Sequence, residues 1–125
     1  MRIAAIIPVR NEETSLPLVL AALPRDLIEE VVVVDNGSTD GTATVARSRG
    51  ATVLEERRGG YGAACLRGIE YLRAGRPNVV VFLDGDYSDH PEEMPLLLDP
   101  ILRGESDLVI GSRLLAEELR DAFDD

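Results

Sequence analysis

The 125-residue sequence contains no lysine, one cysteine and one histidine, and its formal net charge is −10. A single cysteine, Cys65, permits no internal disulfide and no cysteine-based metal cluster, so we expect a reducing, cytoplasmic compartment. The negative charge argues against nucleic acid as a partner, because phosphate-backbone binding depends on Lys and Arg. For the same reason, a phosphorylated ligand would need a cation between itself and the protein.

Long hydrophobic runs are also missing. The apolar run within "MRIAAIIPVRNEE" is far too short for a membrane span or for the core of a signal peptide. We therefore expect a chain that is neither secreted nor membrane-spanning on its own account. Its composition, 45% hydrophobic and 29% charged, is typical of a folded domain. The length of the chain predicts a single domain over residues 1–125.

What the sequence does contain is a series of short apolar runs rich in Val and Ile. Such runs predict strands buried on both faces, as in a parallel sheet covered by helices. The expected strands are Ile3–Ile7, Val31–Val34, Ala51–Leu54, Val79–Leu83 and Leu108–Ile110. Helical patterns alternate with them over Glu13–Leu23, Gly41–Ser48, Gly62–Ala74, Glu92–Leu102 and Leu114–Phe123. The alternation predicts a doubly wound α/β fold, a mostly parallel sheet with helices on both faces.

Polar and glycine residues follow each expected strand. In an open α/β sheet, the loops after the strands share the carboxyl edge, where ligands bind. The five stretches are "PVRNEE" (Pro8–Glu13), "DNGSTDGT" (Asp35–Thr42), "RRGGYGAA" (Arg57–Ala64), "DGDYSDH" (Asp84–His90) and "GSR" (Gly111–Arg113). Their convergence is stronger evidence for a ligand site than any one of them alone.

Each of these loops also has a structural interpretation. The turn formers of "DNGSTDGT" suit a strand-to-helix connection with Asp40 as the helix N-cap, although Asp35 could also accept hydrogen bonds from a base or ribose. "GGYGAA" suits either anion binding at a helix N-terminus or tight helix packing. Arg57, Arg58 and Arg113 are candidates to meet phosphate, with surface charge the alternative for the first two.

The stretch "VVVFLDGDYSDH" carries the sharpest signal. Asp84 and Asp86 are separated by one glycine at the end of a buried strand, so both carboxylates can turn toward one hard cation. Mg²⁺ and Mn²⁺ prefer carboxylate, water and phosphate oxygens, and such an ion typically takes one or two carboxylates from protein. A cation there would let an acidic protein hold a diphosphate. Asp89 is better explained as part of the turn that opens the next helix.

Together, five stretches resemble the family-2 glycosyltransferases of the GT-A type, with the polyprenyl-phosphate mannosyl- and glucosyltransferases as the nearest branch. They are "IIPVRNEE", "VVVVDNGSTDGT", "GYGAA", "VVFLDGDYSDHPEEM" and "LVIGSR", in the family's order and spacing. The resemblance implies a GT-A fold and a UDP- or GDP-linked sugar donor. It also implies a lipid-phosphate acceptor at the membrane surface and a cytoplasmic location peripheral to the inner membrane face.

The resemblance also implies roles for individual residues. Pro8, Arg10 and Glu12 would lie along the base and ribose, while Asp35 would hydrogen-bond the base. A Mg²⁺ or Mn²⁺ ion on Asp86, with Asp84 on the ribose or the same metal, would act as a Lewis acid toward the leaving group. The full implied nucleotide-sugar site is Pro8, Arg10, Glu12, Asp35, Gly37, Gly62, Asp84 and Arg113, with Asp84 and Asp86 as catalytic and metal-binding residues.

After Arg113 the chain departs from the family pattern. The segment "LLAEELRDAFDD" stands where the acceptor-side region should begin. We therefore expect a donor-binding portion, either a fragment or a chain that a partner completes. One alternative is a truncated, non-catalytic module that binds nucleotide or self-associates as a homodimer through its edge strand and uncovered face. Another is a haloacid-dehalogenase-like phosphatase, which "FLDGDYS" resembles, although that motif normally follows a first strand and needs a lysine elsewhere.

Overall fold

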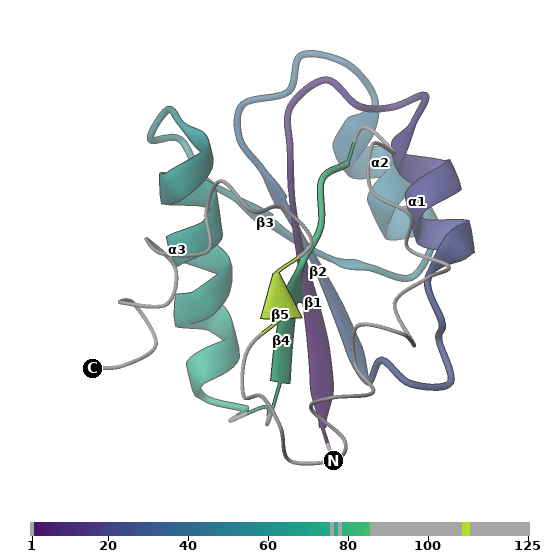
Figure 1. The fold of residues 1–125 in the computed structure, drawn as a ribbon. Helices are drawn as coiled ribbons and strands as arrows, with labels where there is room; N and C mark the ends of the chain where they lie inside the picture. Colours follow the sequence, from purple (N-terminus) through teal and green to yellow (C-terminus); the bar gives the residue numbers. More distant parts are fainter. Residues whose placement is uncertain (1, 76, 78, 86–108, 111–125) are drawn as a thin grey trace.

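The computed structural model describes residues 2–75, 77, 79–85 and 109–110. The elements, in chain order, are β1 (Ile3–Val9), α1 (Leu16–Ala22), β2 (Glu30–Asp35), α2 (Thr42–Ser48), β3 (Thr52–Glu55), α3 (Tyr61–Arg73), β4 (Val79–Phe82) and β5 (Val109–Ile110) (Figure 1). The helices predicted over Glu92–Leu102 and Leu114–Phe123 lie outside the described residues. Within the described part, no helix is long and apolar enough to cross a membrane.

The strands form one parallel sheet in the order β3-β2-β1-β4-β5. β1 lies in the middle, with Val9 beside Asp35 of β2 and Ile6 beside Phe82 of β4. From β1 the chain first moves outward to β2 and β3, then returns to place β4 on the other side of β1. The strand order therefore reverses between β1 and β4, which confirms the doubly wound α/β topology.

Helices cover both faces of the sheet. Helices α1 and α2 lie on one face and α3 on the other (Figure 1). The alternation of side chains along β1 supplies both hydrophobic cores, because successive side chains point to opposite faces. In one core, residues of α1 and α2 pack against strand residues of the same face: Ile3, Ala5, Ile7, Val9, Val31, Val33, Val79, Val81 and Leu83. The other joins α3 to Ala4, Ile6, Val32, Val34, Val80 and Phe82.

The observed N-termini of all three described helices differ from the predicted ones, by three residues for α1 and by one residue for α2 and α3. α1 begins at Leu16 rather than at Glu13, with Pro17 in its first turn, where a missing N–H costs no helical hydrogen bond. The residue at the N-cap of α2 is Gly41, so the prediction that Asp40 would occupy this position is wrong by one residue. Asp40 still serves the helix, because its carboxylate accepts the Thr42 N–H at 3.0 Å. Gly50, at a φ of +82°, follows the end of α2 in the left-handed region that glycine favours there.

The close approach of α3 to β1 depends on a glycine. A Cβ on Gly68 would lie 2.8 Å from Ile6 Cγ2 and 3.0 Å from its Cδ1. Ile6 is fully buried in the sheet, so a shift of its side chain would disturb the core around it. We therefore predict that Gly68→Ala lowers the free energy of unfolding by about 1–3 kcal/mol through overpacking.

Gly62, on the same helix, provides the matched control for that measurement. A Cβ there would meet nothing within 4 Å, so Gly62→Ala should leave the stability unchanged or raise it by up to about 1 kcal/mol. Urea denaturation followed by circular dichroism measures both variants. Equal stabilities of the two variants would contradict the proposed contact between α3 and β1.

Cys65 is fully buried on α3, where it packs as a small hydrophobic residue. Burial raises the pKa of its thiol to about 12, and the negative charge of Asp84 adds to the rise. Because thiolate is the reactive form, we predict no reaction of the native protein with a thiol reagent at pH 8. In denaturant, one thiol per chain should react. Rapid modification of the native protein would show that the helix does not shield Cys65.

Candidate functional site

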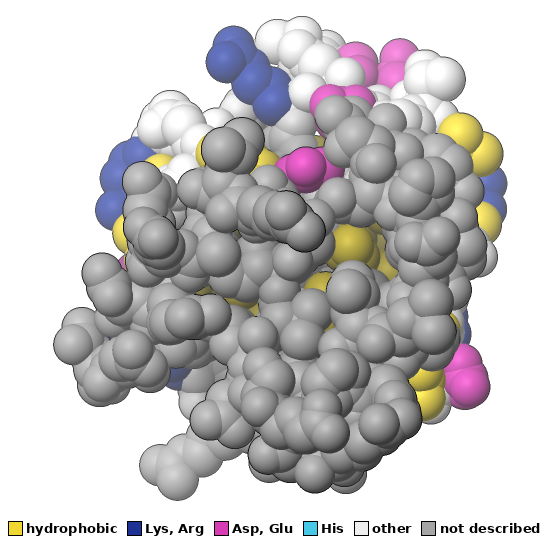
Figure 2. Space-filling view, in the orientation of Figure 1, with side chains coloured by type: hydrophobic (Ala, Val, Ile, Leu, Met, Phe, Trp, Pro, Cys, Tyr) yellow, Lys and Arg dark blue, Asp and Glu magenta, His cyan; other side chains and the backbone are white. Residues whose placement is uncertain are grey.

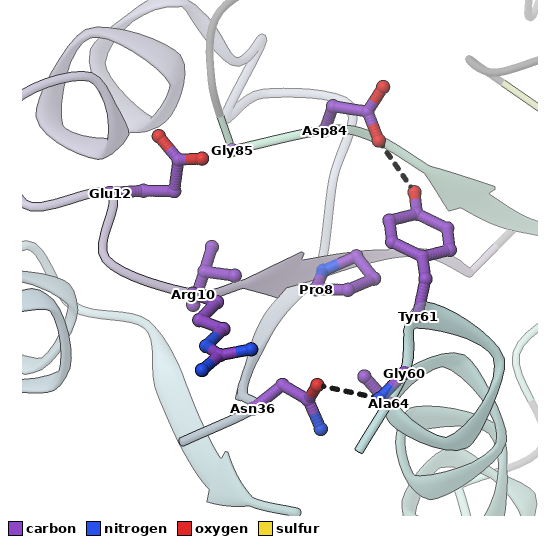
Figure 3. A pocket seen from close by; sticks show the side chains of 10 residues that line it. Pro8, Arg10, Glu12, Asn36, Gly60, Tyr61, Ala64, Asp84 and Gly85 are labelled. Carbon is purple, nitrogen blue, oxygen red and sulfur yellow. Dashed lines mark hydrogen bonds between the residues drawn. The ribbon is translucent and has the colours of Figure 1, made fainter. Parts of the chain in front are cut away.

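A cavity of about 430 Å³ lies at the carboxyl edge of the sheet, beside the point where the strand order reverses. Ligand sites of open α/β sheets occur in this position. Four of the five polar loops supply its walls, and the fifth, Gly111–Arg113, lies outside the described residues. Its described lining residues are Pro8, Val9, Arg10, Glu12, Asn36, Gly60, Tyr61, Ala64, Asp84 and Gly85 (Figure 3).

The loops after β1 and β2 are joined by hydrogen bonds around Asn11. Its backbone N–H donates to Ser38 Oγ at 2.9 Å, and its side-chain Oδ1 accepts the Thr39 N–H at 2.8 Å. Asn11 has a φ of 53°, in the left-handed region that asparagine tolerates better than most residues. The two loops thus satisfy each other's backbone groups, and Ser38 acts structurally here.

Thr42 and Asp40 make a second link between the same loops. The buried Thr42 hydroxyl accepts the Glu12 N–H at 2.9 Å and donates to Asp40 Oδ1. Donation from the Thr42 hydroxyl holds the pKa of the Asp40 carboxyl below its usual value. The backbone of Glu12 is therefore positioned by the β2–α2 loop, and Asp40 also acts structurally.

Asp35 ends β2, but its carboxylate faces its own loop. It is buried, and Oδ1 accepts the Ser38 N–H at 3.0 Å. Neither Asp35 nor Gly37, which adopts a φ of +83°, is among the described residues that line the cavity. The next residue, Asn36, is the one from this strand end that lines it.

Asn36 fastens the β3–α3 loop to the end of β2. Its Nδ2 donates to the carbonyl oxygens of Glu56 at 3.0 Å and Arg58 at 2.7 Å. Its Oδ1 accepts the Gly60 N–H at 3.1 Å, as Figure 3 shows. One amide side chain thus fixes a loop about 20 residues downstream, and this loop leads directly into α3.

The same loop contains an ion pair. Arg58 donates to the buried carboxylate of Glu56 from Nε at 2.9 Å, from Nη2 at 3.2 Å and from its backbone N–H at 2.9 Å. These donors lower the pKa of Glu56 to about 2. The guanidinium of Arg58 is thus paired within its own loop, which favours the structural interpretation of this arginine over phosphate binding.

Asp84 follows β4 and is half-buried at the cavity wall. Its Oδ1 accepts a hydrogen bond from the Tyr61 hydroxyl at 2.7 Å. Gly85 is required next to it, because a Cβ at this position would lie 2.5 Å from Val9 Cγ1. The carbonyl oxygen of Gly85 lies 2.6 Å from the Ser15 hydroxyl, which is also 2.7 Å from Glu12 Oε2.

The structure therefore brings together part of the predicted site. Pro8, Arg10, Glu12 and Asp84 all line the cavity. Asp35, Gly37 and Gly62 lie outside its described lining, and Asp86 and Arg113 lie outside the described residues. Asn36 and Tyr61 are lining residues that the sequence interpretation did not single out. Their place within two of the glycine-containing loops was the available signal.

The chemistry of the cavity suits a divalent cation with phosphate. Glu12 and Asp84 contribute carboxylates and Arg10 an exposed guanidinium, and oxygen donors are the ligands of Mg²⁺ and Mn²⁺. Among the described residues, no group of three or more His, Cys, Asp or Glu side chains forms a complete protein site. Mg²⁺ typically takes one or two carboxylates from the protein when phosphate oxygens supply its other ligands.

In Figure 2, acidic and arginine side chains both appear at the top of the molecule, where Figure 1 places the loops after β1 and β2.

The Glu56–Arg58 pair generates a pH prediction. Because the pKa of Glu56 falls from 4.5 to about 2 on folding, its contribution to stability is present above pH 4.5 and lost as the pH falls toward 2. We predict that Glu56→Gln flattens the fall in urea midpoint over this pH range. Glu55→Gln, at the exposed neighbouring position, should keep the wild-type dependence. Identical curves for the two variants would contradict the assignment.

Comparisons with known proteins extend these observations. The profile of glycosyl transferase family 2 matches residues 4–122. An uncharacterized glycosyltransferase of Mycobacterium tuberculosis is 44% identical over 111 residues, which cover 89% of this chain and 48% of that protein. The undecaprenyl-phosphate mannosyltransferase of Micrococcus luteus is 40% identical over 121 residues, with 90% and 49% covered. This chain spans about half the length of these relatives.

A solved structure agrees with the fold. The crystal structure of glucosyl-3-phosphoglycerate synthase from Mycobacterium tuberculosis, in complex with Mn²⁺, UDP and glucosyl-3-phosphoglycerate, superposes with a TM-score of 0.71 at 34% identity. The match covers 83% of this chain and 40% of that one. The sheet topology, the position of the cavity and the family profile agree, and the chain belongs to glycosyl transferase family 2.

Proposed function

We propose that this chain is the donor-binding part of a glycosyltransferase that takes its sugar from a nucleotide-diphosphate sugar. The observation that carries the proposal is the meeting of Arg10, Glu12 and Asp84 in one cavity at the reversal of strand order. The related synthase of Mycobacterium tuberculosis was crystallised with UDP and Mn²⁺, which supports a UDP-linked donor. A GDP-linked donor is the alternative that the same cavity chemistry allows.

Each end of the donor has a proposed set of partners. Pro8, Arg10 and Glu12, on the strand and loop of β1, lie along the nucleoside, with Asp35 and Gly37 supporting the neighbouring loop. Asp84 and Asp86 hold a Mg²⁺ or Mn²⁺ ion on the diphosphate, and Gly62 and Arg113 belong to the phosphate side. When bound, the ion supplies Lewis-acid stabilisation of the nucleoside diphosphate as it leaves.

The acceptor is proposed from relatives. Because the Micrococcus luteus relative is an undecaprenyl-phosphate mannosyltransferase, we propose a polyprenyl phosphate as the acceptor. Such a lipid places the reaction at the inner face of a membrane, with the protein bound peripherally from the cytoplasm. Self-association through the sheet edge stays a prediction. The family assignment removes the support for a phosphatase.

Binding of UDP-glucose and GDP-mannose by isothermal titration calorimetry tests the donor assignment. We predict that binding depends on Mn²⁺. Asp84→Asn and Asp86→Ala should each weaken this binding at least tenfold, equivalent to about 1.4 kcal/mol. Asp26→Asn is the matched control, because Asp26 is exposed in the loop that precedes β2, at the amino edge of the sheet.

The outcomes separate the proposals. Affinity that is equal with Mn²⁺ and with EDTA would remove the metal role of the two aspartates. Metal-dependent binding without transfer to undecaprenyl phosphate would make this chain the nucleotide-binding module that was considered as an alternative. No binding of either nucleotide sugar would overturn the donor assignment itself.

A further inference from the structure

The hydrogen bond between Tyr61 and Asp84 connects two loops that are far apart in the sequence. Tyr61 opens α3, and Asp84 follows β4, 23 residues later. The tyrosine hydroxyl donates to Oδ1 of the carboxylate at 2.7 Å, and both side chains line the cavity (Figure 3). A bond of this length to an ionised acceptor is charge-assisted and directional.

The backbone of Tyr61 is fixed by contacts at the start of α3. The preceding residue, Gly60, has a φ of +109°, and its N–H donates to Asn36 Oδ1 at 3.1 Å. One turn later, Ala64 and Cys65 are fully buried against the sheet. These contacts fix the Tyr61 backbone, from which the hydroxyl reaches Asp84 Oδ1.

The backbone of Asp84 is fixed by the contacts of the residues before and after it. Leu83 donates its N–H to the carbonyl oxygen of Ile6 at 3.0 Å, which continues the pairing of β4 with β1. Gly85 packs against Val9, and its carbonyl oxygen lies 2.6 Å from the Ser15 hydroxyl. These contacts set the position of the Asp84 backbone but leave the rotation of its carboxylate to side-chain partners.

We propose that Tyr61 is a positioning residue for Asp84 in the complex with nucleotide and divalent cation. Its hydroxyl holds Oδ1, and this sets the plane of the carboxylate before the ligand arrives. The proposal rests on the proposed function, because it assigns Asp84 to the nucleotide–cation complex. Hydrogen-bond partners of metal-binding carboxylates typically contribute 10- to 100-fold in metal affinity. An ordered carboxylate also loses less conformational freedom on binding.

Titration with Mn²⁺ in the presence of UDP, followed by the electron paramagnetic resonance signal of free Mn²⁺, tests the proposal without any activity assay. We expect Tyr61→Phe, which removes only the hydroxyl, to weaken Mn²⁺ binding about 10- to 100-fold. Tyr71→Phe, nearer the C-terminal end of the same helix, should bind as the wild type does. Circular dichroism of the unliganded variants checks that both are folded.

A double-mutant cycle then asks whether Tyr61 acts through Asp84. The affinity for UDP at one fixed Mn²⁺ concentration is measured by isothermal titration calorimetry in the wild type, in Tyr61→Phe, in Asp84→Asn and in the double variant. We expect the loss caused by Tyr61→Phe to shrink below about twofold once Asp84 is replaced, because coupled residues are not additive.

Three results would overturn the proposal. Wild-type Mn²⁺ affinity in Tyr61→Phe would mean that the hydroxyl does not position the carboxylate. An equal loss in both backgrounds of the cycle would mean that the hydroxyl contacts the ligand directly. Failure of the wild-type protein to bind Mn²⁺ with either UDP or GDP would overturn the proposed function, and with it this role of Tyr61. The first two results leave the proposed function standing, so the failures are distinguishable.

Discussion

The burial of β1 between two parallel neighbours is the constraint on which the rest of the structure depends. A strand covered by helices on both faces needs apolar side chains at every position, and Ile3–Val9 supplies them. Because β2 and β3 occupy one side of β1, β4 pairs on the other, and the chain reverses its direction across the sheet. The reversal opens the space at the carboxyl edge where the cavity lies.

The loops at this edge are shaped mainly by their contacts with one another. Asn11 and Thr42 join the first two loops, and Asn36 binds the third. Many of the polar residues that resemble a ligand site by composition satisfy neighbouring backbone groups, as buried loop groups must. What remains directed at the cavity is a smaller set, with Arg10, Glu12 and Asp84 as its charged members.

This division explains how far the site was predictable. Asp84 lines the cavity, and its place directly after a buried strand already indicates that its carboxylate emerges at the sheet edge. Asp35 ends a strand in the same way, yet its carboxylate turns back to the Ser38 N–H. Both residues have the same sequence signature. Whether such a carboxylate faces the cavity or its own loop depends on a nearby backbone N–H donor, which the position in the strand does not reveal. The Tyr61–Asp84 bond was likewise invisible, because it depends on where α3 begins relative to β4.

The order of the described elements, the parallel sheet and the family follow from the sequence, as does the carboxyl edge as the expected place of the site. These features are local, because continuous apolar runs, their lengths and the glycine-rich turns between them can be seen residue by residue along the chain. Tertiary structure alone decided which loop residues face the cavity and which face each other. That choice depends on contacts between segments 20 to 70 residues apart, such as Asn36 with Glu56 and Ser15 with Gly85. Hydrogen-bond geometry between such segments is set by the packing of the whole sheet, which no local pattern encodes.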